Sequence, residues 1–456
     1  MKQDLHTVAQ NPPKMGANNG VENALPYLNC DLMKKAEQKL LCHLKIALKF
    51  VLLTLGQMSN FCLFYYLADI ALTRWVMSID TYKPTATEPL DQEILKKLDN
   101  GFRRLTWARR QFSQSLLKRF LVKSVFHTLK HRQTSGNINL YDIAKSGFEH
   151  LDSKIGVFAH NEECYKVFKP ILHPVICTIH QATPLASHPK ESNWSDIEHL
   201  EVELDPEGKY IDKITMTVSK NITPYPFVPS MTKSQFESLE REIRGTMKTM
   251  TTLTGVYYSL GSIPKDVKLI LGREDLIFDN AGDKFLETAG VFNHWPAGRG
   301  VFLTHMKDVF IWINQLEHFT LGVTQKGGAN IKNVFHRLFQ TLQSINDSLR
   351  WSQDDFWGLV TMSPALIGSG LKIYVYVKLP YLGQEESFRQ DLLDQYGLEC
   401  VKAKHTLSDN RIFVLSNRRT FGLTESEILS SVHRCLKEMI TIEQKFKDSA
   451  AKEREA

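Results

Sequence analysis

Apolar residues recur with two different periods along the chain, and the change of period divides it. In residues 95–184 they recur every three or four positions over several turns, which predicts a small α-helical domain. The Pro/Ser-rich stretch at 182–196, ATPLASHPKESNWSD, is typical of a linker. Beyond it the period becomes two, which predicts strands. The strand candidates are HLEVELD, DKITMTVSK, GRGVFLTH, DVFIWIN, LKIYVYVKLP and NRIFVLSN.

Helix start signals lie between these strand candidates. Thr232 with Gln235, and Thr424 with Glu427, have the spacing of a capping box, in which each side chain accepts a hydrogen bond from the other residue's backbone N–H. Each pair precedes an apolar run of helical period. Short strands separated by such helices predict an α+β architecture, in which helices flank an antiparallel sheet.

Residues 1–90 do not share this pattern. The opening QNPPKMGANNG is polar and rich in Pro, Gly and Asn, which predicts disorder. Residues 50–68 carry no charge over 19 positions, just enough for a helix to cross a bilayer of ~30 Å. Because Thr54, Gln57 and Asn60 lie near the middle, we expect an amphipathic or buried helix here, with a membrane tether as the alternative.

The composition is that of a folded protein with more than one domain. The chain has 456 residues, of which 43% are hydrophobic and 23% charged, and this length exceeds what one core usually supports. Its net charge of +6 is interleaved along the chain, so no basic face for nucleic acid is expected. The seven cysteines lie far apart without a CxxC pair, which favours a reducing cytoplasmic location and predicts no metal site.

Several stretches match one protein family in order and spacing. They are DPEGKY, YPF, GDKFLETAGVFNHWPAGRGVF, DVFIWIN, KLP and SNRRTFGLTE, together with SLLKRFL, KSGFEHLDSKIGVFA and YKVFKPIL in the helical part. With these motifs the chain resembles the phosphagen (ATP:guanidino) kinases, nearest to arginine kinase, as a divergent member. The resemblance implies their fold, with a small all-α domain at 95–184, an α+β domain at 197–447 and a tail at 448–456. It also implies transfer of the γ-phosphoryl group of ATP to a guanidino compound.

The resemblance places five phosphate-binding arginines, and none of them is present here. Arginine suits that role because its planar fork pairs two phosphate oxygens at once, and cations supply much of the catalysis of phosphoryl transfer. Carried over residue by residue, the five positions fall on Thr215, Thr217, Thr320, Lys372 and Lys402. Three cationic sites are therefore lost and two are reduced to lysine. These five positions are the nucleotide-binding candidates.

The groups that activate the guanidinium nitrogen in this family are replaced as well. Its two orienting glutamates fall on Leu316 and Leu407, and its reactive cysteine falls on Ser363. A serine cannot supply a thiolate near neutral pH. The histidine that stacks near the nucleotide base falls at about Asp275. The resemblance therefore leaves no catalytic residue at the degraded positions Leu316, Ser363 and Leu407.

The loop that gathers the amino-acid end of the substrate in this family survives in part. Ser153, Ile155 and Gly156 keep its outline within DSKIGVF. Lys154 replaces a glycine, and Phe158 replaces a tyrosine and lacks its hydroxyl. We therefore expect the usual substrate to fit poorly.

Positions that serve structure are retained by contrast. Asp152 and Lys284 match an acid–base pair that ties the two domains together in the family, with Lys in place of Arg. The turn WPAGRG at 295–300 keeps the glycines that permit it. Packing positions are thus kept while the chemistry is replaced.

Two functions are compatible with this contrast. The first is a catalytically weak or inactive pseudoenzyme that serves as a binding or scaffold protein for an unidentified protein partner. The alternative is an active arginine or guanidino kinase in which Lys372, Lys402 and Arg299 bind phosphates and Ser363 replaces the thiol. If activity remains, ATP and Mg²⁺ are the cofactors, and ATP/ADP and an arginine-like guanidino compound are the ligands. Either protein would be cytoplasmic, or tethered to a membrane through residues 50–68.

Overall fold

The computed structural model of the protein forms two compact units, Met1–Ala71 and Leu72–Ala456, and only the second is described below. The described residues of the chain are 70–78, 80, 82, 89–107, 115–190, 197–198, 200–250, 253–280, 282–328, 330–402 and 412–455. The segment 50–68, with its predicted helix, lies outside them. No helix among the described residues is long and apolar enough to cross a membrane.

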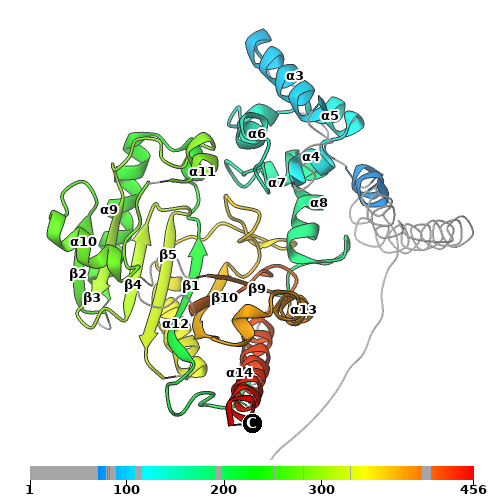
Figure 1. Ribbon diagram of the computed structural model, residues 1–456. Helices are drawn as coiled ribbons and strands as arrows, with labels where there is room; N and C mark the ends of the chain where they lie inside the picture. Colours follow the sequence, from blue (N-terminus) through cyan, green and yellow to red (C-terminus); the bar gives the residue numbers. More distant parts are fainter. Residues whose placement is uncertain are drawn as a thin grey trace, which may run out of the picture. The chain divides into compact units, whose positions relative to one another are not determined.

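Short helices form the small domain that precedes the sheet, as predicted (Figure 1). Phe120, Phe148 and Phe168 fill its core and are fully buried. Asn139 starts α6 with a capping box, because its side chain accepts from the N–H groups at the helix start and Asp142 accepts in return. The helices are α3 (Gln92–Trp107), α4 (Leu116–Phe120), α5 (Lys123–Leu129), α6 (Leu140–Glu149), α7 (Cys164–Val167) and α8 (Lys169–His180).

Residues just before this domain pack onto it. Trp75 is buried and its ring contacts His173 of α8 edge-on, with 5.7 Å between ring centroids. The Asp80 carboxylate accepts a hydrogen bond from Arg132 (2.7 Å), and both side chains of this ion pair are largely buried. Tyr82 places its ring 5.0 Å from the same guanidinium. Residues 75–82 therefore pack onto the helical domain although they precede residue 95, where its predicted range begins.

An eight-stranded sheet lies at the centre of the larger domain, and its neighbouring strands are antiparallel, as predicted (Figure 1). The strand order is β2-β3-β4-β5-β1-β8-β10-β9. Because β1 lies between β5 and β8, segments far apart in the sequence meet at the middle of the sheet. The strands are β1 (Ile211–Lys220), β2 (Gly255–Ser259), β3 (Gly300–Thr304), β4 (Val309–Ile313), β5 (Phe319–Lys326), β8 (Leu371–Lys378), β9 (Leu398–Lys402) and β10 (Ile412–Asn417).

The two faces of this sheet differ in character. Met216 and Val218 of β1 are buried on the face covered by α12 (Ile331–Asn346). Because successive side chains of a strand point to opposite faces, Thr215 and Thr217 lie on the other face. Four of the predicted nucleotide positions, Thr215, Thr217, Thr320 and Lys372, lie on that second face, which is hereafter called the hydroxyl face.

Two of the remaining helices, α9 and α14, begin where the predicted capping boxes place their starts. At α9 the N–H of Gln235 donates to the Thr232 hydroxyl (3.3 Å) and the N–H of Thr232 donates to the Gln235 side chain (2.8 Å), which confirms the first capping box. Thr424 and Glu427 form the second one ahead of α14, at 3.2 and 2.8 Å. α14 runs on to Glu455, so most of the predicted tail is helical. The remaining helices are α9 (Lys233–Thr249), α10 (Lys265–Arg273), α11 (Lys284–Thr288), α13 (Glu386–Tyr396) and α14 (Glu425–Glu455).

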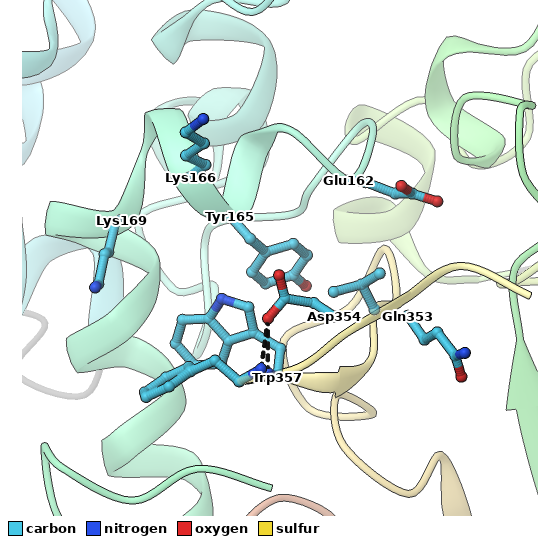
Figure 2. A pocket seen from close by; sticks show the side chains of 9 residues that line it. Glu162, Tyr165, Lys166, Lys169, Gln353, Asp354 and Trp357 are labelled. Carbon is cyan, nitrogen blue, oxygen red and sulfur yellow. Dashed lines mark hydrogen bonds between the residues drawn. The ribbon is translucent and has the colours of Figure 1, made fainter. Parts of the chain in front are cut away.

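A short hairpin of β6 (Gln353–Asp354) and β7 (Gly358–Leu359) lies against the helical domain (Figure 2). The Tyr165 hydroxyl of α7 donates to the carbonyl of Thr361, just beyond the hairpin, at 2.6 Å. The rings of Tyr165 and Trp357 contact each other, with centroids 5.9 Å apart. The two domains are therefore joined here by a buried hydrogen bond and by aromatic packing.

One predicted strand is wrong. HLEVELD contains no strand in its described residues. The Asp205 carboxylate at its end accepts hydrogen bonds from the N–H groups of Lys209, Tyr210 and Ile211, at 3.0, 2.7 and 2.7 Å, and these bonds fold a turn immediately before β1. A local side-chain cap of this kind competes with pairing in a sheet, and here it outweighs a short alternation of apolar residues.

Candidate active site

The register of three neighbouring strands brings four predicted positions together. Thr320 of β5 stands opposite Ser219 of β1, and Lys372 of β8 stands opposite Thr217. Thr215 lies two residues from Thr217 on the same face of β1. The sequence landmarks thus place these candidates side by side on the hydroxyl face, at the middle of the sheet.

Two hydrogen-bonded pairs of hydroxyls cross from β1 to β5 on this face. Ser219 Oγ and Thr320 Oγ1 are 2.9 Å apart, and Thr215 Oγ1 and Thr324 Oγ1 are 3.0 Å apart. In each pair one hydroxyl donates and the other accepts, so the groups satisfy each other. These hydroxyl pairs are neutral, and they stand where the resemblance places arginines. Thr217, between them on β1, is also buried and uncharged.

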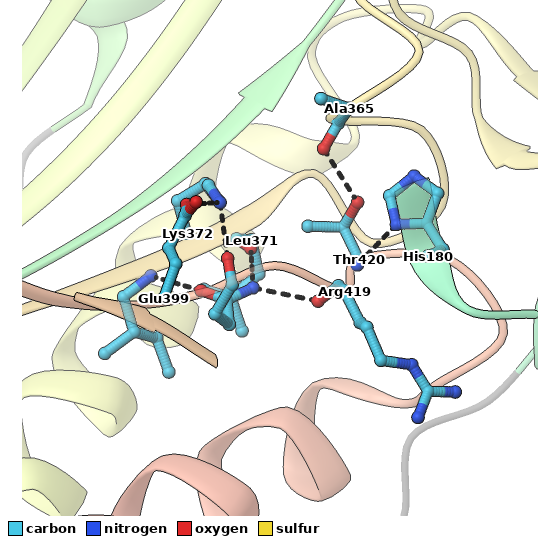
Figure 3. A network of polar contacts seen from close by, with 9 residues as sticks. His180, Ala365, Leu371, Lys372, Glu399, Arg419 and Thr420 are labelled. Atoms are coloured by element: carbon cyan, nitrogen blue, oxygen red, sulfur yellow. Dashed lines mark hydrogen bonds and ion pairs between the residues drawn. The ribbon is translucent and has the colours of Figure 1, made fainter. Parts of the chain in front are cut away.

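Of the four positions on the hydroxyl face, the one with a cationic side chain is Lys372. Its amine already binds other groups of the protein (Figure 3). Its amine donates to the carbonyl of Asn417 and to Glu399 Oε1, the latter at 3.4 Å. Burial lowers the pKa of Lys372, while Glu399 opposes that shift. An incoming phosphate would have to compete with a carboxylate and a carbonyl for this amine.

A neutral histidine holds the loop that contains SPALIGSG. His180 Nδ1 accepts from the N–H of Thr420 at 3.1 Å (Figure 3). Its Nε2 lies 2.9 Å from the carbonyl of Pro364. The Thr420 hydroxyl donates to the carbonyl of Ile367 at 2.8 Å. Burial lowers the pKa of His180 to about 4, so the ring is neutral and can accept at one nitrogen and donate at the other. The loop is therefore tied to the chain after β10.

A buried carboxylate, that of Glu317, follows directly after Leu316, where the resemblance puts a glutamate. Leu316 packs partly buried against the core, whereas Glu317 is fully buried. Glu317 accepts hydrogen bonds from Asn221 Nδ2 (2.5 Å) and from the N–H groups of Met362 (2.8 Å) and Ser363 (3.1 Å). Burial raises its pKa to about 7, although the three donors act in the opposite direction. Glu317 thus fixes a loop, and its oxygens are occupied by these donors.

The serine that replaces the family's cysteine lies at the start of the same loop. Ser363 is mostly buried, and its hydroxyl accepts from the N–H of Ala365 at 3.4 Å. Its carbonyl accepts from the Thr361 hydroxyl at 2.8 Å. The backbone groups and the hydroxyl oxygen of Ser363 therefore each have a partner within the protein. That Ser363 is a degraded position stays a prediction.

Arg299 does not lie on the hydroxyl face, so its predicted phosphate-binding role in the active-kinase alternative is wrong. Its guanidinium is fully buried and donates to the carbonyls of Asn314 (3.0 Å), Val291 (2.7 Å) and Ala297 (3.4 Å). It also lies over the ring of Phe236, 4.2 Å from the centroid. Arg299 holds the WPAGRG turn from inside, and the sequence alone does not show which way such a side chain points.

Replacing Arg299 should therefore damage stability. We expect Arg299→Met to lower the free energy of unfolding by at least about 2 kcal/mol, because several buried carbonyls lose their donor. Urea denaturation measures this loss. Arg241→Met, which changes an exposed arginine of α9, is the matched control and should cost less than about 0.5 kcal/mol. Equal stability of the two variants would contradict the structural role of Arg299.

The predicted substrate loop forms part of the core of the helical domain. Ser153 and Phe158 are almost fully buried, and Ile155 is half-buried. Gly156 has φ of 77°, and a Cβ there would lie 2.8 Å from Leu117 Cβ, so only glycine fits. Phe158 packs in the core, and it brings no polar group in place of the hydroxyl of the tyrosine that the resemblance puts at this position.

The predicted pair between the two domains is confirmed. Lys284 Nζ lies 2.7 Å from Asp152 Oδ2, and both side chains are about half exposed. The hydrogen bond from Lys284 lowers the pKa of Asp152. An exposed pair of this kind contributes little free energy, so it adds little to the stability of the domain interface.

Asp275, at the position that matches the base-stacking histidine, forms an ion pair with Lys213. Asp275 accepts from Lys213 Nζ (2.9 Å) and from the Tyr376 hydroxyl (3.3 Å). The Lys213 amine also lies 4.1 Å from the centre of the Tyr376 ring. Of the other predicted positions, Lys402 ends β9, and Leu407 lies outside the described residues.

Sequence reasoning did not find the polar network that supports this region. It consists of Asn221, Glu317 and His318, of which His318 Nδ1 accepts from the N–H of Ile222 at 3.0 Å. The N–H of His318 in turn donates to Asn221 Oδ1 at 2.9 Å. The available signal was a Glu-His pair directly after an apolar strand, where buried polar groups need partners.

Comparison with known proteins identifies the family. The model of the ATP:guanido phosphotransferase C-terminal catalytic domain matches residues 238–446, and that of the N-terminal domain matches residues 111–177. Arginine kinase of Limulus polyphemus is 33% identical over 358 residues, which cover 78% of this chain and 99% of that protein. Arginine kinase Lit v 2.0101 of Penaeus vannamei is 31% identical over 359 residues, with the same coverage. The chain belongs to the ATP:guanido phosphotransferase family.

Solved structures agree with the fold. The substrate-free duplicated taurocyamine kinase of Schistosoma mansoni superposes with a TM-score of 0.69 at 24% identity, covering 79% of this chain and 49% of that one. The chain thus spans about half of that duplicated protein. A lombricine kinase gives a TM-score of 0.67 at 23% identity, covering 74% of this chain and 93% of that one. At these identities the likeness concerns the fold alone.

Proposed function

We propose that the protein keeps the phosphagen kinase fold without phosphagen kinase turnover, and that it acts as a cytoplasmic binding or scaffold protein for a protein partner. The observation that carries this proposal is the two hydroxyl pairs on the hydroxyl face. They are neutral and mutually satisfied at the places where the resemblance puts guanidinium groups. The fold is retained, and the charge that phosphoryl transfer requires is not.

The expected loss of rate follows from the role of cations in this reaction. Phosphoryl transfer is accelerated mainly by positioning and by charge placed around the transferring group. Loss of one such charge typically costs about 10²–10³-fold in rate. Such losses do not simply multiply, because the groups act as a unit. We therefore expect turnover at least about 10³-fold below that of an arginine kinase.

The residues present do not fit the MgATP that the family uses. Lys372, which would face the phosphates, is bonded to Asn417 and lies beside the carboxylate of Glu399, which would repel them. Asp275 is paired with Lys213 at the position matching the base-stacking histidine. No step of a reaction is therefore assigned to ATP or Mg²⁺ in this protein.

A coupled assay of the full chain tests the proposal. The chain is incubated with ATP, Mg²⁺ and, in turn, arginine, taurocyamine and lombricine, which are the substrates named by the relatives, with Limulus arginine kinase as the positive control. We expect no substrate-dependent ADP release above about one thousandth of the control rate. Turnover within tenfold of the control on any of the three substrates would overturn the proposal and support the active-kinase alternative.

A further inference from the structure

A cleft of about 270 Å³ lies between α7–α8 and the hairpin β6–β7 (Figure 2). Tyr165, Phe356 and Trp357 give it aromatic walls. None of its lining residues belongs to the hydroxyl pairs or to the loop at Ser363. The cleft is therefore separate from the site matched by the family, and it takes one wall from each domain.

Lys169 brings an unneutralised charge to this cleft. Its side chain is partly buried at the start of α8, and burial lowers its pKa. In the described part of the chain its amine has no ion pair or hydrogen bond, and its contact is the Phe356 ring, 5.7 Å to the centroid. The carboxylates of Asp80 and Asp354 act on the Lys169 amine without forming an ion pair with it, and Asp80 is used by Arg132. A partly desolvated ammonium without a carboxylate partner is stabilised by an incoming anion.

A carboxylate is fixed on the opposite wall. Asp354 Oδ1 accepts from the N–H groups of Phe356 (2.8 Å) and Trp357 (3.0 Å), and these bonds lock the side chain in the hairpin turn (Figure 2). Among the described residues its second oxygen, Oδ2, has no hydrogen-bond donor. The cleft thus presents the ammonium of Lys169 and the carboxylate of Asp354 on two different walls, with aromatic rings beside them. Glu162 and Lys166, both from the helical domain, add one further charge of each sign to the lining.

We propose that this cleft binds a free α-amino acid with an aromatic or apolar side chain. Its carboxylate pairs with Lys169, its ammonium pairs with Asp354, and its side chain packs on Phe356 and Trp357. Sites for larger ligands have roughly 300–1,000 Å³, so the volume suits a molecule of this size better than a nucleotide. The carboxylate of Asp354 also disfavours a ligand that is only anionic. Because Lys169 and Asp354 come from different domains, the ligand bridges the domains, whatever the activity at the hydroxyl face.

Titration calorimetry of the full chain with L-phenylalanine tests this site. We expect saturable binding with a Kd of a few millimolar or tighter. Phenethylamine lacks the carboxylate and 3-phenylpropionate lacks the amine, and each should bind at least tenfold more weakly. If 3-phenylpropionate or inorganic phosphate binds as tightly as L-phenylalanine, the site is an anion site and the proposal fails. Absence of binding at 20 mM L-phenylalanine also overturns it.

Variants separate this site from a non-specific effect. Lys169→Met keeps the aliphatic stem over Phe356 and removes the charge, and it should weaken L-phenylalanine binding at least tenfold. Lys190→Met removes an exposed lysine that pairs with Asp355 of the same hairpin but does not line the cleft, and it should leave the affinity within twofold. The thermal midpoints of the unliganded variants verify that both are folded. Unchanged affinity in Lys169→Met overturns the assignment.

Discussion

Mild acid should destabilise this protein strongly, because five histidines of its described part are held neutral by burial. Burial lowers the pKa of His173 to about 3 and the pKa values of His160, His180, His188 and His318 to about 4. Below the unfolded pKa of about 6.5, the unfolded chain takes up protons that the folded chain does not. Stability is therefore lost as pH falls from about 6.5 towards 4.

The loss of unfolding free energy in mild acid is the sum of a large histidine contribution and a smaller opposing contribution from Glu317. Between pH 7 and pH 5.5 each neutral histidine costs somewhat over 1 kcal/mol, and the five together cost roughly 6 kcal/mol. Glu317 acts in the opposite direction, because its raised pKa of about 7 lets the folded chain hold a proton that the unfolded chain loses above about 4.5. The net expected loss is about 5 kcal/mol, or roughly 10 °C in thermal midpoint.

Thermal unfolding at several pH values measures this slope. His318→Gln should remove about one fifth of the histidine contribution, whereas His127→Gln, at an exposed position, should leave the slope unchanged. A thermal midpoint that stays constant from pH 7 to pH 5 would show that the buried rings are protonated in the folded state, contrary to our expectation.

Removing the Glu317 carboxylate should have the second large effect. Glu317→Ala leaves the N–H groups of Met362 and Ser363 without an acceptor in a fully buried place, and the Asn221 amide keeps only its 3.3 Å hydrogen bond to the carbonyl of Val360. Each unsatisfied buried group costs about 1–3 kcal/mol, so we expect a loss of about 4 kcal/mol or more. Urea denaturation measures the loss, and amide hydrogen exchange at Met362 and Ser363 should accelerate locally.

Two further variants make this test specific. Glu317→Gln keeps one acceptor but points an amide N–H₂ at a donor, so its loss of stability should lie between those of the wild type and Glu317→Ala. Glu386→Gln changes an exposed acid at the start of α13 and should have no measurable effect. A Glu317→Ala variant within 1 kcal/mol of the wild type would mean that water or another group satisfies these donors.

The architecture could be predicted because burial sets the period of apolar residues. The alternation in β1 places Met216 and Val218 against α12, and both capping boxes mark true helix starts. The exceptions are local. HLEVELD alternates, but the Asp205 carboxylate turns the chain at its end. The strands β2, β5 and β9 were not among the strand candidates; β2 and β9 have only five residues each, GVYYS and LECVK, and carry too little pattern to stand out.

The site could be predicted in position but not in its contacts. Landmarks in the sequence identify Thr215, Thr217 and Thr320 as the matching positions, and the register of β1 against β5 brings them together on one face. Spacing gives no information on a partner far along the chain, such as the Asn417 carbonyl that engages Lys372. Nor does it give direction, and so Arg299 could be assigned to phosphate although it points into the core. Whether Lys402 or the position of Leu407 contributes to ligand binding stays a prediction.

The central claim is that the hydroxyl face lacks the charge that holds a phosphoryl group during transfer. Nitrate is a planar anion with the shape of that group in a loose transition state. Calorimetric titration of the full chain with MgADP, at saturating arginine with and without nitrate, therefore measures this charge directly. We predict no nitrate-dependent binding of MgADP: either MgADP does not bind, or nitrate changes its affinity by less than twofold, because Thr215, Thr217 and Thr320 are neutral. A nitrate-dependent tightening of tenfold or more would contradict the claim.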